Sequence, residues 1–149
     1  MDLRTTALTL RQLLDATEKQ FHAISDEAAS RSVGPGRWSR KQILGHLIDS
    51  AANNHQRFIR LQLTLELHFP SYQQSDWVSR NQYGERPWAE LVSLWTALNR
   101  HLAHVIEHIA PETLVNVWDT GSNRYTLGFI VDDYLVHLRH HLEQIMAAG

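Results

Sequence analysis

The chain has 149 residues, of which 43% are hydrophobic and 20% are charged, as is usual for a soluble globular protein. We therefore expect one domain covering residues 1–149. The formal net charge is −2, so no excess of basic residues predicts binding to nucleic acid or anionic lipid. The sequence contains no cysteine, which excludes disulfides, thiolate nucleophiles and cysteine-based zinc sites.

The sequence also shows no membrane-spanning or export signal. No segment approaches about 18 consecutive apolar residues, and the N-terminus lacks the basic and apolar regions of a signal peptide. We therefore expect a cytoplasmic protein without a membrane partner. Ten histidines are the unusual feature of the composition. Imidazole is a common metal ligand and titrates near neutral pH, so these histidines are candidates for a metal or acid–base site.

Two amphipathic helices are predicted in the first half of the chain. Apolar residues at helical spacing indicate one helix from Leu3 to about Ile24, and the glycine- and proline-rich segment 32–37 ends it. Ser39 is a good N-cap for the second helix, and Gln42 completes a capping box. The apolar stripe of this helix continues to about Leu67.

Two further helices are predicted in the second half. Pro87 suits the first position of a helix that extends to about Ile109. Thr126 is a candidate N-cap for a last helix, from about Leu127 to Met146. Between these two helices, the sequence around Gly121 predicts a turn or a short hairpin.

The connection between the second and third helices, residues 68–86, is unusually long. Adjacent antiparallel helices are usually joined by 2–8 residues, so this length indicates a crossover or the wall of a pocket, with a short helical turn around Trp77. Four amphipathic helices and one long crossover predict an all-α fold, a four-helix bundle.

Three histidines could form a metal site within this bundle. His137 and His141 are four residues apart on the last helix, so their side chains project from one face with Cβ atoms roughly 6 Å apart. His46 lies in a polar strip, with Asp49 and others, that borders the apolar stripe of the second helix. Three imidazoles with an open fourth position are typical of a catalytic zinc site, and imidazole also suits Ni, Cu and Fe.

The spacing alone does not single out this site. His104 and His108 have the same separation on the third helix, where they align with charged residues and indicate a solvated face. A histidine at a helix margin is more often solvated than a ligand. From the residues, three alternatives stay open: a metal-dependent enzyme, a binding module with a structural or vestigial metal site, and a bundle that binds no metal.

Several motifs together resemble the DinB/YfiT-like family of metal-binding four-helix bundles. The strongest are the Gly-His-Leu context of His46 and the His-x3-His motif of the last helix. Similar features span most of the chain, in segments 38–51, 76–83, 88–99, 125–128 and 137–145.

The resemblance implies a fold, a ligand set and a class of chemistry. Family members bind a divalent metal, commonly Zn or Ni, through histidines that correspond to His46, His137 and His141. They form up-down-down-up bundles and are frequently dimers, so we expect a homodimer. Their activities include transfer reactions with low-molecular-weight thiols such as bacillithiol, mycothiol or glutathione, and many members have no established reaction.

We therefore expect a divalent-metal-dependent enzyme, either a thiol-dependent S-transferase or a hydrolase, that acts on a small molecule. Any thiol must come from outside the chain, since the chain has no cysteine. Asp49, one turn after His46, is the candidate general base or supporting carboxylate. Tyr83, Trp77 and Trp118 are candidates for the walls of a pocket. The alternative is a non-catalytic metal-binding or stress-response dimeric bundle.

Overall fold

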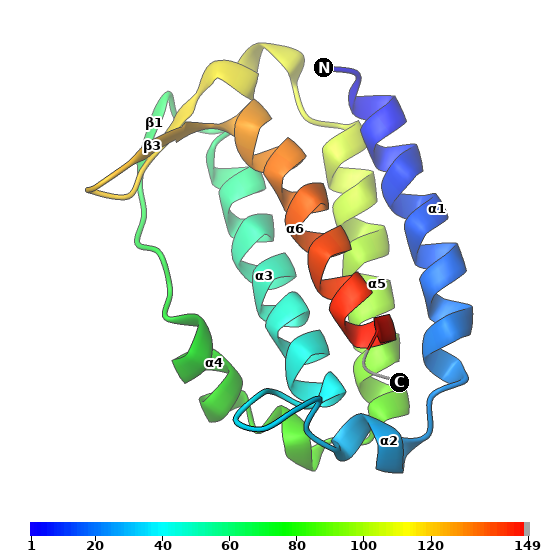
Figure 1. Ribbon diagram of the computed structural model, residues 1–149. Coiled ribbons are helices and arrows are strands. Elements are labelled where there is room, and N and C mark those ends of the chain that lie inside the picture. The colour runs from blue at the N-terminus through cyan, green and yellow to red at the C-terminus, as the bar shows by residue number, and fades with distance from the viewer. Residues whose placement is uncertain (148–149) are drawn as a thin grey trace.

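The computed structural model describes residues 1–147 and is dominated by four long helices (Figure 1). The domain expected over residues 1–149 extends two residues beyond this range. The four helices of the bundle are α1 (Leu3–His22), α3 (Arg40–Arg60), α5 (Trp88–Glu107) and α6 (Leu127–Ala147). Shorter elements fill the connections: α2 (Asp26–Ser30), α4 (Gln74–Asn81) and two 3₁₀ turns, η1 (Tyr83–Glu85) and η2 (Pro111–Val115).

The helix directions confirm an up-down-down-up bundle. The first and last helices, α1 and α6, run in one direction (downward in Figure 1), and the two middle helices, α3 and α5, run in the opposite direction. Helix α1 packs against α5, and α3 packs against both α5 and α6. Because α3 and α5 are parallel neighbours, the chain must travel the length of the bundle between them. This requirement explains the long crossover after α3.

Side-chain capping sets the start of two helices as the sequence predicts. The Ser39 hydroxyl accepts a 3.2 Å hydrogen bond from the Gln42 backbone N–H, and the Gln42 side-chain oxygen accepts one of 2.9 Å from the Ser39 N–H. This is the predicted capping box. The Thr126 hydroxyl likewise accepts a 3.1 Å bond from the Phe129 N–H at the start of α6.

The end of α3 differs from the prediction. The helix stops at Arg60 and not near Leu67, and the last leucines of the sequence pattern do not face the core: Leu63 and Leu65 are each 80% exposed. The Leu61 carbonyl instead accepts a 2.7 Å hydrogen bond from the Asn116 side chain. The chain then continues as a strand.

Three short strands form a small sheet at one end of the bundle (Figure 1). Strand β1 (Glu66–His68) pairs in parallel with β2 (Val117–Asp119), which pairs antiparallel with β3 (Arg124–Thr126). The β2–β3 turn is the hairpin predicted around Gly121, which has φ +94°. The parallel β1–β2 pairing joins segments far apart in the sequence, so local patterns could not reveal it.

Smaller differences concern the other helix ends and the connections. Helix α1 ends at His22, and the separate helix α2 follows it, capped by the Ser25 hydroxyl. Pro87 is the N-cap of α5 and not its first residue, and α5 ends at Glu107. The helical turn expected around Trp77 is the eight-residue α4. In residues 1–147, no helix is both long and apolar enough to cross a membrane.

Candidate metal centre and adjoining pocket

The bundle brings the three predicted ligands together from two helices. His46 lies on α3, and His137 and His141 lie on the neighbouring helix α6. The Nε2 atom of His137 is 3.4 Å from Nε2 of His46 and 3.0 Å from Nε2 of His141. His46 is buried, whereas the two histidines of α6 are half-buried. The site is therefore closed on the side of α3 and open on the side of α6.

All three imidazoles are held in the neutral form that metal ligation requires. Burial, and then the nearby His141 and His137, lower the pKa of His46 to about 4. Burial is also the main reason that the pKa values of His137 and His141 are lowered. At pH 7 the cluster therefore offers uncharged nitrogen atoms to a cation.

One hydrogen bond fixes which nitrogen of His141 can act as a ligand. His141 Nδ1 lies 2.7 Å from the Gln144 side-chain oxygen. An amide oxygen can only accept, so Nδ1 carries the proton and Nε2 keeps its lone pair. Such support of the second ring nitrogen is a regular feature of metal-binding histidines.

The geometry of the cluster fits a small divalent ion. Two nitrogen atoms that are each about 2.1 Å from a tetrahedral zinc lie roughly 3.4 Å apart, close to the separations of 3.0 and 3.4 Å between the Nε2 atoms. His46 Nδ1 is buried and has no hydrogen-bond partner among the described residues. Its other ring nitrogen, Nε2, faces His137 and is the atom that would hold the ion.

Asp49 lies one turn beyond His46 on α3 and is also buried. Its Oδ1 atom accepts hydrogen bonds from the Tyr83 hydroxyl (2.6 Å) and from the Asn81 side-chain amide (3.1 Å). Its Oδ2 atom is buried and has no partner among residues 1–147. Burial raises the pKa of Asp49 to about 6, although the bond from Tyr83 acts in the opposite direction. Asp49 is therefore a carboxylate whose pKa suits proton transfer near neutral pH.

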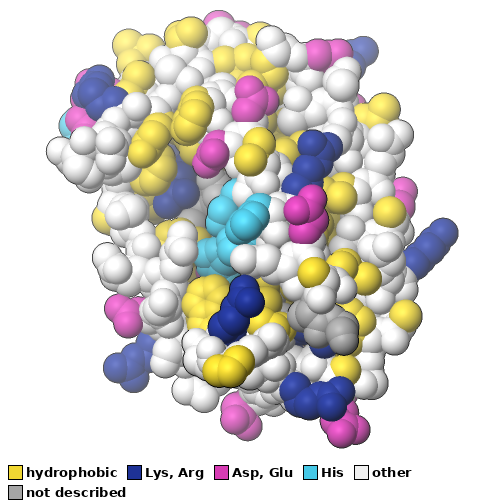
Figure 2. All heavy atoms as spheres, viewed as in Figure 1, with side chains coloured by type: hydrophobic (Ala, Val, Ile, Leu, Met, Phe, Trp, Pro, Cys, Tyr) yellow, Lys and Arg dark blue, Asp and Glu magenta, His cyan; other side chains and the backbone are white. Residues whose placement is uncertain are grey.

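A cavity of about 520 Å³ adjoins the histidine cluster, and His137 forms part of its wall. Figure 2 shows histidine side chains gathered beside a hollow on the face formed by α3 and α6. Of the predicted pocket walls, Trp118 lines this cavity, together with Tyr72 from the crossover. Trp77 and Tyr83 line two other surface pockets. The cavity gives a small molecule access to the open side of the cluster.

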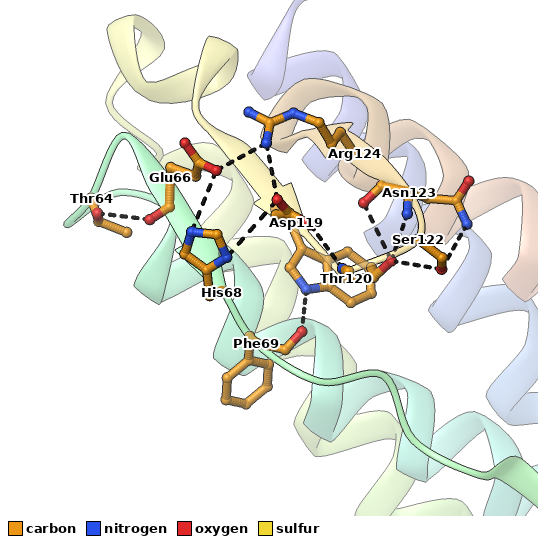
Figure 3. Close-up of polar contacts among 11 residues, drawn as sticks. Thr64, Glu66, His68, Phe69, Asp119, Thr120, Ser122, Asn123 and Arg124 are labelled. Atoms are coloured by element: carbon orange, nitrogen blue, oxygen red, sulfur yellow. Dashed lines mark hydrogen bonds and ion pairs between the residues drawn. The ribbon is translucent and has the colours of Figure 1, made fainter.

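A second group of possible ligands, at the sheet, is an ion-pair network (Figure 3). Glu66, His68 and Asp119 lie close together there, but both carboxylates are paired with Arg124 at 2.9 and 3.0 Å. Figure 3 shows the Arg124 guanidinium over both acids, where it already serves as their shared cation. This cluster joins β1 to the hairpin.

The histidines of α5 form a solvated face, as the sequence predicts. His101, His104 and His108 are exposed, although the rings of the last two lie only 4.4 Å apart. The same i, i+4 spacing therefore occurs once on the surface and once beside a partner helix. Among residues 1–147, only the second case brings ligand nitrogens of three imidazoles within 4.8 Å of one another.

Two contributors to the site were not predicted from the sequence. Asn81, on α4, reaches Asp49 only because the crossover folds back onto α3. Arg57 lines the cavity with its buried side chain. A signal for Arg57 was present, since it follows Asn53 by four residues, and Asn53 belongs with His46 and Asp49 to the polar strip of α3.

Comparisons with known proteins agree with this geometry. A protein of Oceanobacillus iheyensis, provisionally named a metal-dependent hydrolase, is 26% identical over 133 residues, which are 82% of this chain and 71% of that protein. The solved structure of YfiT from Bacillus subtilis, described as a probable metal-dependent hydrolase with an unusual four-helix-bundle topology, superposes with a TM-score of 0.79 at 18% identity and covers 97% of this chain and 85% of that one. The family model of the DinB superfamily matches residues 9–145. This chain therefore belongs to the DinB superfamily.

Proposed function

We propose that this protein is a divalent-metal-dependent enzyme that binds Zn or Ni through His46, His137 and His141 and acts on a small molecule. The observation that carries the proposal is the convergence of three neutral imidazoles from two helices, with Nε2 atoms 3.0 and 3.4 Å apart. The names of the two relatives point to the same class of chemistry.

The ligand set favours a catalytic ion over a structural one. Structural zinc sites normally fill four positions with protein groups, whereas catalytic sites keep one position open. In residues 1–147, the cluster contains three candidate ligands, and a cavity adjoins one of them. His46, His137 and His141 would hold such an ion, which would supply Lewis-acid chemistry for a nucleophile at the open position.

The residues of the chain provide the proton acceptor and the shape of the site. The nucleophile is a water molecule for a hydrolase, or an exogenous low-molecular-weight thiol for an S-transferase, because the chain has no cysteine. We assign Asp49 as the general base. Tyr83 and Asn81 hold this carboxylate in place through its Oδ1 atom.

An activity assay separates this proposal from a non-catalytic metal-binding or stress-response bundle. The metal-loaded protein is offered ester and amide substrates, and separately an electrophile with bacillithiol, mycothiol or glutathione. We expect turnover in one of the two assays, its loss after chelation and its return when Zn or Ni is added. In that active assay, Asp49→Asn should retain the metal but lower kcat.

A metal-loaded protein that is inactive in both assays would favour the non-catalytic alternative. The cavity beside His137 supports the enzyme, since a site that only stores or senses an ion has no need of space for a second molecule. We further propose that the protein is a cytoplasmic homodimer without a nucleic-acid partner, as expected from the sequence and the family.

A further inference from the structure

Arg57 is a buried cation without a matching anion. Its side chain lies on α3, is 6% exposed and lines the same cavity as His137. Its side chain donates one long hydrogen bond, from Nη1 to the Asn54 side-chain oxygen at 3.5 Å. The Nε atom is buried and has no hydrogen-bond partner within residues 1–147. No carboxylate of residues 1–147 lies within ion-pair distance, 4.0 Å, of the guanidinium.

A buried arginine without a counter-ion lowers the stability of the folded protein. A buried charge without a counter-ion loses hydration and gains little in return, and burial lowers the pKa of Arg57 for the same reason. A neutral side chain of similar length would fill the space at lower cost. The unpaired charge therefore points to a ligand that supplies the missing anion.

The surroundings of Arg57 hold its guanidinium in a fixed plane. The central carbon lies 3.9 Å from the ring centroid of Trp118, a contact that uses the face of the guanidinium. Trp118 is itself fixed by a 2.8 Å hydrogen bond from its indole N–H to the Phe69 carbonyl. Stacking leaves the N–H groups along the guanidinium edge free, and that edge matches a carboxylate in a paired, two-point geometry.

The other groups around the cavity restrict the charge of the ligand. Asp133 is the one acidic residue among the described residues of the wall, and it is exposed and four positions before His137. Arg57 is the one cation of the described wall, since His137 is neutral at pH 7 and the other polar residues carry no charge. The protein itself thus offers one fixed positive charge, which suits a monoanionic carboxylate, and the exposed Asp133 repels a dianionic phosphate more strongly than a monoanion.

We propose that Arg57 binds the carboxylate of a small molecule whose other end reaches the three-histidine centre. The cavity of about 520 Å³ has the size of a small-ligand site and is shared by Arg57 and His137. The claim that the other end of this ligand reacts at the three-histidine centre rests on the proposed function, whereas the carboxylate contact with Arg57 does not. The carboxylate belongs either to the substrate or to a thiol co-substrate, and both would use the same contact.

Titrations with matched small molecules test the proposal. The probes are mercaptocarboxylates with chains of two to six methylene groups, the mercaptoalcohols of equal length and the carboxylates without a thiol, with inorganic phosphate for comparison. Dissociation constants are measured by NMR for the Zn-loaded and the metal-free protein. The variants are Arg57→Met, Arg57→Lys and the control Arg60→Met, which removes an exposed arginine from the same helix.

The expected pattern depends on the carboxylate and on Arg57 together. At least one mercaptocarboxylate should bind the Zn-loaded protein at least about tenfold more tightly than the matching mercaptoalcohol. Arg57→Met should abolish this preference, Arg57→Lys should retain part of it, and Arg60→Met should leave it unchanged. Three results would overturn the proposal. They are equal affinity for acid and alcohol in the unchanged protein, equal loss of the preference in Arg57→Met and in Arg60→Met, and tighter binding of phosphate than of the carboxylates.

Two further readouts separate a binding role from a structural one. If Arg57 only anchored Trp118, Arg57→Met would lower the melting temperature; a ligand-binding role predicts a melting temperature that is unchanged or higher. If the metal fails to bind at all, the proposed function fails, yet the metal-free protein should still show Arg57-dependent binding of the simple carboxylates. Strong binding of the thiols that is equal in the unchanged protein and in Arg57→Met would support the metal centre and overturn the role of Arg57. The source of the carboxylate follows from whether the thiol-free acids or the mercaptocarboxylates bind more tightly to the Zn-loaded protein.

Discussion

The Tyr83 hydroxyl donates a 2.6 Å hydrogen bond to Asp49 Oδ1, and this bond ties the crossover between α3 and α5 to the interior of α3. The Tyr83 ring packs over Gly45, one residue before His46. One tyrosine thus fixes both the carboxylate and the helix segment that carries a proposed metal ligand. The crossover is part of the site and not only a connection.

The raised pKa of Asp49 predicts a pH-dependent effect of Asp49→Asn on stability. The ordinary pKa is 3.8 and the folded value is about 6, so the folded protein holds the proton more tightly than the unfolded chain. The ionised carboxylate therefore costs stability as pH rises from about 4 to 6, and the full cost persists above that range. Two pKa units correspond to roughly 3 kcal/mol.

Urea unfolding of the metal-free protein between pH 4 and pH 7.5 checks this. The unfolding free energy of Asp49→Asn, minus that of the unchanged protein, should rise by roughly 2–3 kcal/mol across the range. The histidine contributions are common to both proteins and cancel in the difference. Asp76→Asn, at an exposed acid of α4, is the control for the loss of a carboxylate from the protein surface. If the difference in unfolding free energy between Asp49→Asn and the unchanged protein did not vary with pH, the raised pKa of Asp49 would be wrong.

The contact between Gly45 and Tyr83 predicts an unusual response to alanine. A Cβ atom at Gly45 would lie 2.1 Å from a carbon of the Tyr83 ring, so the ring would have to move. Alanine normally stabilises a helix interior by about 1 kcal/mol relative to glycine, but overpacking of a tight contact costs about 1–3 kcal/mol. We expect Gly45→Ala to be destabilising in urea unfolding, and to weaken metal binding through the displaced crossover.

Gly128 provides the matched control for this substitution. It lies in the first turn of α6, where an added Cβ would meet neighbours at ordinary distances of 3.5 Å or more. Gly128→Ala should therefore leave stability unchanged or raise it slightly. If both alanine variants were equally stable, the close packing of Tyr83 on Gly45 would be wrong.

The sequence was sufficient to predict most of the bundle because the relevant signals are local. The capping box at Ser39 and the cap at Thr126 depend on residues only three positions apart. The apolar stripes of the four helices face a common core. The histidine cluster could also be predicted, since the spacing of His137 and His141 is local and the resemblance supplied His46.

The remaining features depend on contacts between distant segments. Leu63 and Leu65 continue the apolar pattern of α3, but the chain leaves the helix because strand β1 pairs with β2, some fifty positions later. Asn81 meets Asp49 through the same kind of long-range folding. Arg57 is the exception, because its place on the polar strip follows from local helical spacing.

The core predicts that the bundle does not need the metal to fold. The buried apolar residues of α1, α3, α5 and α6 form one continuous cluster, and the ion would add only the stabilisation expected from ligand linkage. Far-UV circular dichroism with and without chelator should show the same helix content at 25 °C, with a modest rise in melting temperature when the metal is present. Unfolding on chelation would instead identify a structural site.

Metal stoichiometry in matched histidine variants is the most direct test of the proposed centre. The protein is loaded with Zn or Ni, dialysed and analysed for metal by mass spectrometry, alongside His137→Ala and His104→Ala. His104 is exposed on α5 and forms part of an equally spaced pair, so it controls for adventitious binding by surface imidazoles. We predict about one ion per chain in the unchanged protein and in His104→Ala, and a loss of stoichiometric binding in His137→Ala. Equal metal content in all three proteins, or equal loss in both variants, would contradict a centre built from His46, His137 and His141.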